Sequence, residues 1–343
     1  MFFKISTLQI WNENKDRVFK ESGISSIRQL IEILFWRLRG FNGFEYYVYP
    51  LYEYDPRPVL KVRDYDKIYP LLNPELKGVI AVDKWIQAAI WKANNIPHAE
   101  VLGFVKGGLG VLDGKSYDGS DKVLAGFLLE RSFPLVIKPL DGSNGLGFDF
   151  INEYDQGSGT LKLVKGGMLS LKEFQKQYLE SPEGILFQNK IEQHTILSRV
   201  FPHALNTIRV ITYLDSQGEY KVIQGMAKFG TGNDIIDNNE NCGILADVDI
   251  DAGCLGPGKL RFGVGEFINH PDTGEVILGV RVPFWKEVAE LGLKAHRLIP
   301  SARYFGWDIA ISKEGPKIIE VNSYTSIAVN QKLSGSDWST LGL

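Results

Sequence analysis

The stretch that most constrains the fold is "GWDIAISKEGPKIIEVNS", residues 306–323, because it reads as two apolar strands joined by a short turn. Isoleucine and valine favour strands on both sides of "KEG", and Gly315 supplies the left-handed residue that ends a three-residue hairpin loop. Pro316 is tolerated as the first residue of the second strand. Elsewhere strand-like and helix-like runs alternate without a regular βαβ series, so the sequence predicts an α+β protein with much antiparallel pairing.

The predicted hairpin brings polar side chains together. With a three-residue loop, residue 312 pairs with 316 and 310 with 318, so Asp308 faces Glu320 and Asn322 projects on the same face. Two facing carboxylates destabilise a sheet unless a cation lies between them. Carboxylate and amide oxygens without thiolate or imidazole are the ligand set of a hard ion such as Mg²⁺. The alternative is a solvated hairpin with a slipped register, since a four-residue loop would break the pairing.

A second stretch, "VIKPLDGSNGLGFDF", residues 136–150, places three glycines between two predicted strands. Their GxxGxG spacing is neither of the common nucleotide-binding patterns, and the loop does not open a helix. Glycines nevertheless let backbone N–H groups turn toward an anion, and a lysine lies beside them. The residues of this candidate phosphate cradle are Lys138, Gly142, Ser143, Asn144 and Gly145. A plain hairpin turn explains the Asp-Gly and Asn-Gly pairs equally well.

Composition excludes several classes of protein. The 343 residues suffice for two or three subdomains, and a net charge of −3 argues against a dedicated nucleic-acid binder. The N-terminus lacks the features of a signal peptide, and no apolar run is long enough for membrane insertion. Cys242 and Cys254 form no CxxC pair and are expected to be reduced thiols of a cytoplasmic protein. The five histidines lack metal-site spacing and are expected to lie in the core or on the surface.

The predicted secondary-structure pattern changes along the chain. Residues 1–75 form an aromatic-rich region with one clear helix, capped by Ser25 or Ser26 and ended by Gly40. Helices and strands alternate over 76–187, and strands dominate 188–343. The tyrosine-rich run that follows Gly40 either packs across another domain or forms a surface extension.

The two candidate sites together indicate Mg-ATP, because magnesium held by few protein ligands completes its shell with phosphates. Arg209 and Lys228 stand inside apolar strands joined through "DSQGE". A lone cation in a strand is more often a surface residue, but beside a nucleoside triphosphate it would stabilise transferring phosphoryl charge. No Ser-His or Cys-His arrangement suggests a protein nucleophile.

Taken in their order along the chain, these motifs resemble those of the ATP-grasp superfamily, and most closely those of its sugar-transfer-associated group. The matching stretches include "DKWIQAAIWKANNIPHAE", "FPLVIKPLDGSNGLGF", "LNTIRVITYL", "HPDTGE" and the hairpin of residues 306–323, and they cover most of the chain from about 80 to 325. The resemblance implies the ATP-grasp fold, in which two α+β subdomains clasp ATP, here preceded by the helical and aromatic N-terminal region.

The resemblance also implies roles for named residues. Lys84 and Lys138 would contact the ATP phosphates, and the loop from Gly142 to Gly147 would be a lid over them. Gln188 and the backbone of Lys190 and Ile191 would meet adenine, and Glu192 would hold ribose. Arg209 would contact the γ-phosphate or the acyl phosphate, and Lys228 would take part in catalysis. Asp308, Glu320 and Asn322 would hold the metal, and Asn238 would bind the substrate.

Most members of the superfamily join a carboxylate to an amine through an acyl phosphate, so the resemblance implies an ADP-forming carboxylate–amine ligase. Its substrate would be an amino acid or a uronic-acid sugar in polysaccharide or natural-product assembly. Two alternatives stay open at this stage, a small-molecule kinase and a non-catalytic ATP-binding module. The sequence names neither the two substrates nor the oligomeric state.

Overall fold

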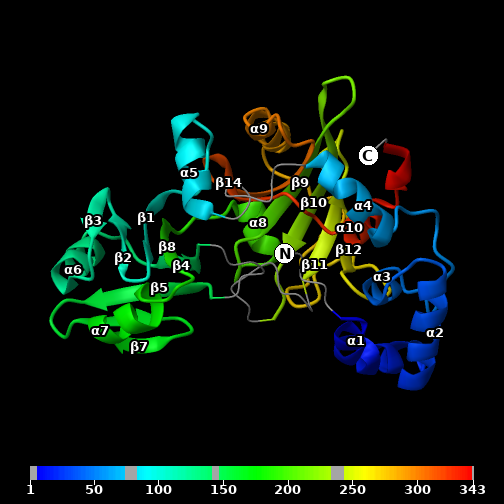
Figure 1. Cartoon of the computed structure of the whole chain (residues 1–343), viewed down its shortest axis with the longest axis horizontal. Helices are drawn as coiled ribbons and strands as arrows, with labels where there is room; N and C mark the ends of the chain where they lie inside the picture. Colours follow the sequence, from blue (N-terminus) through cyan, green and yellow to red (C-terminus); the bar gives the residue numbers. More distant parts are fainter. Residues whose placement is uncertain (1–5, 74–82, 141–146, 233–242, 342–343) are drawn as a thin grey trace.

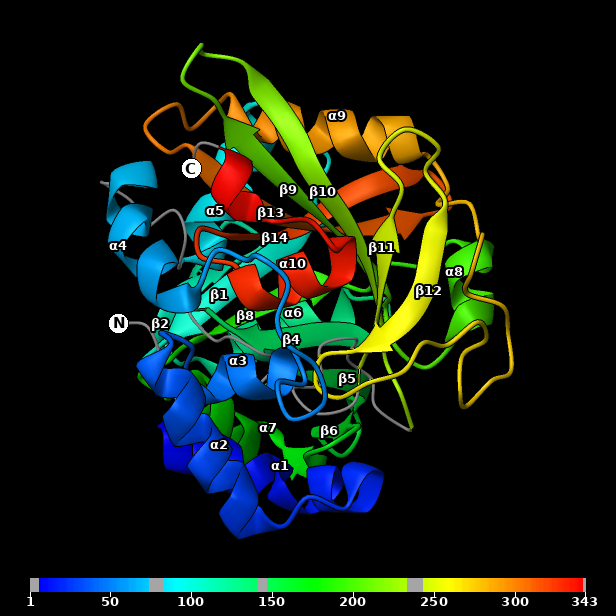
Figure 2. The same cartoon turned by 90° about the vertical axis from the view of Figure 1, so that its right-hand side faces the viewer.

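The computed structural model describes residues 6–73, 83–140, 147–232 and 243–341, and two antiparallel sheets organise them. Figure 1 shows one sheet at the left and the other near the centre, with helices packed on both, and Figure 2 gives the view turned by 90°. The α+β class predicted from the sequence is confirmed.

The first sheet has eight strands, all paired antiparallel. In spatial order they are β3 (Lys115–Tyr117), β2 (Leu109–Leu112), β1 (Val101–Lys106), β8 (Ile185–Asn189), β4 (Leu135–Pro139), β5 (Asp149–Asp155), β6 (Thr160–Leu163) and β7 (Gly167–Ser170). Helix α6 (Asp121–Leu129) and helix α7 (Leu171–Phe174), which continues into the π-helical turn η2 (Gln175–Leu179), bury their apolar residues against it. The side chains of Ser120 and Ser170 cap α6 and α7.

The second sheet has six strands, also antiparallel. In spatial order they are β12 (Leu255–Leu260), β11 (Ile244–Val248), β10 (Tyr220–Phe229), β9 (Thr207–Leu214), β13 (Tyr304–Ser312) and β14 (Gly315–Asn322). One face packs against α9 (Trp285–His296), α8 (Thr195–Val200) and Trp91 of α5 (Lys84–Ala93). Alternate residues of β9 and β13 therefore face the largest core, and the residues between them face the other way.

The N-terminal helices and the C-terminal segment cover part of that other face. They are α1 (Thr7–Ser22), α2 (Ser26–Leu38), α3 (Gly43–Val48), α4 (Val62–Leu72), α10 (Ile327–Ser334) and the 3₁₀ turn η3 (Trp338–Leu341). Tyr46 and Tyr47 are fully buried in a cluster that includes Met226 of β10 and Ala328 of α10. The tyrosine-rich run therefore packs across the six-stranded sheet, and the buried Trp338 packs the C-terminal segment onto the same side.

Asn73 at the end of α4 ties this N-terminal layer to the second sheet. Its amide donates hydrogen bonds to the carbonyls of Tyr304 (2.8 Å) and Ser323 (3.0 Å), and its oxygen accepts from the backbone of Arg303 and Tyr304. A buried amide with all these partners fixes the end of β14, where Ser323 follows Asn322. The layer thus helps to position the residues predicted to form the site.

Candidate functional site

A cleft of about 520 Å³ lies between the two sheets. Its wall contains nine of the residues predicted from the sequence, which are Lys84, Lys138, Gln188, Lys190, Ile191, Glu192, Lys228, Asp308 and Glu320. Two more, Arg209 and Asn322, contact Asp308 directly. Residues that are far apart in the sequence therefore meet in one place.

The hairpin that carries Asp308 and Glu320 differs from the prediction in its turn. Ser312 pairs with Gly315, so the loop has two residues rather than three, although Gly315 has the expected positive φ of 132°. Continued without interruption, this register would place Ile319 opposite Asp308 and send Glu320 to the other face. A β-bulge at Ile319 adds one residue to β14 and restores the predicted pairing of Asp308 with Glu320.

Asp308 is held by two cations and one amide. Arg209, its neighbour across the strands, donates from Nε to Oδ1 (2.7 Å) and from Nη2 to Oδ2 (2.6 Å). Lys228 Nζ lies 3.1 Å from Oδ2, and Asn322 Nδ2 lies 3.3 Å from it. Burial alone would raise the pKa of Asp308, but the charges and hydrogen bonds of Arg209 and Lys228 outweigh it and lower the pKa well below its usual range.

A glycine makes room for this arrangement. Gly306 lies two residues before Asp308 on the same face, and a Cβ there would come within 2.5 Å of Thr325 and 3.6 Å of Arg209 Cδ. Any other residue at position 306 would have to displace Thr325, while its contact with Arg209 would be an ordinary van der Waals one.

Glu320 has a different environment, because two lysines face it across the cleft. Lys84 Nζ, at the start of α5, lies 3.8 Å from Glu320 Oε1 and also contacts the carbonyl of Leu140. Burial, and after it the charge of Lys84, lower the pKa of Lys138 on β4 to about 8, against the opposing charge of Glu320. These lysines therefore present positive charge to whatever enters the cleft.

Charge is unevenly distributed over the described part of the site. Five cationic groups (Lys84, Lys138, Lys190, Lys228 and Arg209) meet three acidic ones (Glu192, Asp308 and Glu320), an excess of two positive charges. The chain as a whole carries −3. A cleft with this local excess favours an anionic ligand.

The residues predicted to meet a base and a sugar lie at the end of β8. Gln188 is buried opposite Val136 of β4, and Lys190 extends toward the ring of Phe150, with its Nζ 5.8 Å from the ring centroid. Glu192 is exposed and pairs with Lys313 of the hairpin turn (3.1 Å). This pair joins the segment after β8 to the second sheet.

The structure adds residues that the sequence reading missed. An apolar part of the wall, beside the predicted Ile191, is formed by Val136, Phe148, Phe150, Leu205 and Ile319. Phe148, just before β5, and Phe150 and Asn152 within it recur at every second position, a period-two signal that could have been read from the sequence. Ile319 could not, because only the bulge turns it toward the cleft. Ser198 and His203 add polar groups to the wall.

The oxygen donors at the charged end fit magnesium. Asp308 and Glu320 face each other with the amide of Asn322 beside them, and no thiolate or imidazole of the described residues is among these groups. Oxygen donors of this kind suit Mg²⁺. Within the described ranges no cluster of three or more His, Cys, Asp or Glu residues could hold a metal by itself.

Five predicted residues, Gly142, Ser143, Asn144, Gly145 and Asn238, lie outside the described residues. The segment that holds the first four joins β4 to its neighbour β5, and the residues that flank it, Pro139 and Phe148, line the cleft. Their roles, and those of the other site residues, stay predictions.

Comparisons with known proteins bear on this site. Residues 64–336 match the model of the family described as sugar-transfer associated ATP-grasp. A search of curated proteins found no match. Among solved structures, the chain is similar to N5-carboxyaminoimidazole ribonucleotide synthetase from Thermotoga maritima (13% identity, TM-score 0.37, 71% of this chain and 42% of that chain).

Two further solved structures show the same level of similarity. One is D-alanine–D-alanine ligase from Bacillus anthracis complexed with ATP (13% identity, TM-score 0.42, 76% of this chain and 64% of that chain). The other is the biotin carboxylase domain of 2-oxoglutarate carboxylase from Hydrogenobacter thermophilus, with MgADP and bicarbonate (12% identity, TM-score 0.39, 75% and 46%). The chain spans less than two thirds of the length of each of these structures.

Proposed function

The chain belongs to the sugar-transfer associated ATP-grasp family, and we propose that it is an ATP- and magnesium-dependent ligase that joins a carboxylate to an amine. The observation that carries the proposal is the cleft itself, which has an apolar part, a local excess of two positive charges and a facing pair of carboxylates. Mg-ATP has a matching apolar base and a net charge of about −2 at neutral pH.

Each part of the cleft would have its own role. Adenine would lie against Ile191 and Ile319, near Gln188 and the backbone of Lys190, with ribose at Glu192. The triphosphate would lie along Lys84 and Lys138, and residues 142–147 would serve as the lid that the resemblance implies. Asp308, Glu320 and Asn322 would hold magnesium, which would neutralise phosphate charge. Asn238 is proposed to face the second substrate.

The chemistry needs no protein nucleophile. A carboxylate oxygen of the substrate attacks the γ-phosphorus, the bond to the β-phosphate oxygen breaks, and ADP leaves. The amine nitrogen then attacks the acyl carbon, the bond to the phosphate oxygen breaks, and phosphate leaves while the amine loses a proton. Arg209 and Lys228 would stabilise the charge that develops on the transferred group. Both would turn from Asp308 toward that group.

An amino acid or a uronic-acid sugar in polysaccharide or natural-product assembly is the proposed carboxylate substrate, and the cytoplasm is the expected compartment. The test is ADP release by the purified protein with Mg-ATP and a mixed pool of amino acids and uronates, with mass spectrometry of the products. We expect ADP, free phosphate and a new mass equal to acid plus amine minus water. A stable phosphorylated product would identify a kinase instead, and ATP binding without turnover across widened pools would identify a binding module.

Nucleotide affinity is expected to depend on pH through Lys138. Its pKa is lowered to about 8, so its positive charge is present below pH 8 and is lost as the pH rises through that value. If it binds phosphate, the Kd for ADP is constant below pH 8 and rises roughly tenfold per pH unit above it, until the higher pKa of the bound state is reached. Isothermal titration calorimetry between pH 7 and 9.5, at constant ionic strength, measures this.

The matched control for this prediction is Lys138→Arg, which keeps its charge over the whole range. The variant should lose the break near pH 8 even if its affinity is lower overall. A break that persists in the variant would assign the titration to another group.

A further inference from the structure

Helix α2 turns an apolar face to solvent. Ile27, Ile31, Leu34, Phe35 and Leu38 are between 46% and 90% exposed. Their spacing of three and four residues places them on one side of the helix, so they form a continuous stripe along its length. Single exposed apolar residues are common, but a stripe of five large ones marks an interaction surface.

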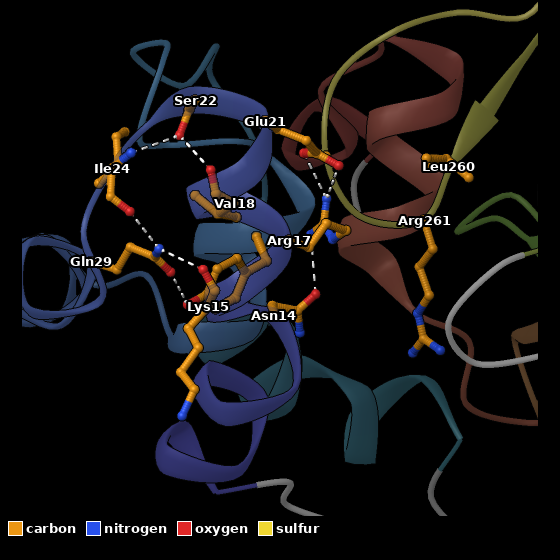
Figure 3. A network of polar contacts seen from close by, with 12 residues as sticks. Asn14, Lys15, Arg17, Val18, Glu21, Ser22, Ile24, Gln29, Leu260 and Arg261 are labelled. Atoms are coloured by element: carbon orange, nitrogen blue, oxygen red, sulfur yellow. Dashed lines mark hydrogen bonds and ion pairs between the residues drawn. The ribbon is translucent and has the colours of Figure 1, made fainter.

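The opposite side of α2 is fixed to the protein, so the helix cannot rotate to bury the stripe. The fully buried Gln29 donates from Nε2 to the carbonyls of Lys15 and Ile24, both at 2.9 Å, and accepts from Tyr47 Oη. Trp36 donates to the carbonyl of Leu51. Figure 3 shows Gln29 pointing from α2 toward the backbone of Lys15 and Ile24. The outward direction of the stripe is therefore built into the packing of α2 on α1 and α3.

Cations gather at the end of the stripe. Arg37 and Arg39 come from α2 and its C-cap, and the guanidinium of Arg39 lies 3.6 Å from the ring centroid of Phe35. Lys61 donates to the carbonyl of Arg39 (2.8 Å), and the guanidinium of Arg63 lies against Gly40. These four residues form what we call the basic end of α2.

Glu32 on α2 and Asp64 beside Arg63 are already engaged. Glu32 accepts from Arg28 (2.8 Å) and from Tyr46 Oη (2.7 Å). Asp64 is paired with Lys67 (2.9 Å) and lies 3.5 Å from Arg63. The surface therefore combines an apolar stripe with a net positive border.

We propose that α2 docks the protein in the plane of an anionic lipid bilayer. A bilayer interface takes up the apolar face of such a helix, and anionic headgroups complement the arginines and lysine beside it. The 13 residues of α2 are too few to span the hydrocarbon core of a bilayer, so the proposed contact is peripheral. No helix of the described residues is long and apolar enough to cross a membrane. The sequence predicts no membrane insertion, and the proposed contact reaches only as deep as the headgroup region.

A second copy of the chain fits this surface less well. The 13 residues of α2 span about 20 Å, so a stripe about 10 Å wide offers a few hundred Å², against roughly 800 Å² per partner in a stable interface. The helix also has no unpaired acid that could meet the arginines of a partner helix. In Figure 1 α2 lies at the right-hand edge and the eight-stranded sheet at the left, so a lipid surface at α2 leaves the cleft open.

The test is co-sedimentation of the full chain with vesicles of phosphatidylcholine containing 30% phosphatidylglycerol, compared with pure phosphatidylcholine. We expect binding to the anionic vesicles that weakens as salt is raised. Leu34→Gln with Leu38→Gln should lower the partition coefficient by at least roughly a hundredfold, since each residue buries a large apolar side chain. Arg37→Gln and Arg39→Gln should each lower binding to the anionic vesicles by roughly fivefold.

Leu109→Gln is the matched control, because Leu109 is 64% exposed on β2, in the other sheet. It should leave vesicle binding unchanged, and all variants should keep the wild-type circular dichroism spectrum because the changed side chains are exposed. Absence of binding to anionic vesicles at low salt would overturn the proposal. So would binding that the α2 variants do not change, or a dimer in sedimentation velocity that depends on Leu34 and Leu38 without any lipid binding.

Discussion

Exchanging Asp308 for asparagine is expected to lower the free energy of unfolding by about 3–5 kcal/mol. The change leaves the shape of the side chain nearly intact but removes its charge. Arg209 and Lys228 then remain buried without their carboxylate partner, since only 17% and 5% of their side chains are exposed. Equilibrium unfolding in urea, followed by circular dichroism and by tryptophan fluorescence, measures the loss.

The control is the same chemical change on the facing strand, Glu320→Gln. The Glu320 side chain is 31% exposed and its contact with Lys84 is long, at 3.8 Å, so this variant should lose less than about 1 kcal/mol. Equal stability losses in the two variants would show that Asp308 does not serve as the internal partner of the two cations.

Turnover, unlike stability, is expected to depend strongly on Glu320. If Glu320 holds magnesium against the phosphates, Glu320→Gln should lower kcat by about a thousandfold or more, because the metal loses a charged ligand where charge develops. Binding of ADP should lose its dependence on magnesium in the same variant. Initial rates with the identified substrates and titrations of ADP with and without Mg²⁺ measure both effects.

Glu314→Gln provides the comparison for this second prediction. Glu314 lies in the turn of the same hairpin, is exposed and pairs only with Lys317 among the described residues. Its variant should keep wild-type kcat and magnesium dependence. If Glu320→Gln retained more than a tenth of the activity, a magnesium role for Glu320 would be wrong.

Several features could be predicted because they follow from short-range patterns. The period of two along a strand places Glu320 and Asn322 on one face, and the isoleucines around them indicate a buried sheet. A cap such as Ser25 marks a helix start through a single side chain. These signals are local, so one sequence is enough to read them.

Other features depend on contacts between distant segments. Two cationic residues inside predicted strands can be recognised in the sequence. That Arg209 and Lys228 both contact Asp308, rather than a ligand, cannot be predicted from it. The spacing of Ile27, Ile31 and Leu34 predicts a helix with an apolar side, yet that side faces solvent because Gln29 and Trp36 find buried partners on the other. The two-residue turn and the compensating bulge are likewise invisible without the partner strand.

Because of the bulge at Ile319, the length of the hairpin turn can change without moving the carboxylates of the cleft. Pairing from Ser312 to Ile309 follows one register and pairing from Asp308 to Gly306 follows another, displaced by one residue. A three-residue turn, closed by a pair of Ser312 with Pro316, would hold Asp308 opposite Glu320 without the bulge and without any change in chain length. The length of the turn can therefore drift among descendants of this protein while the two carboxylates keep their positions.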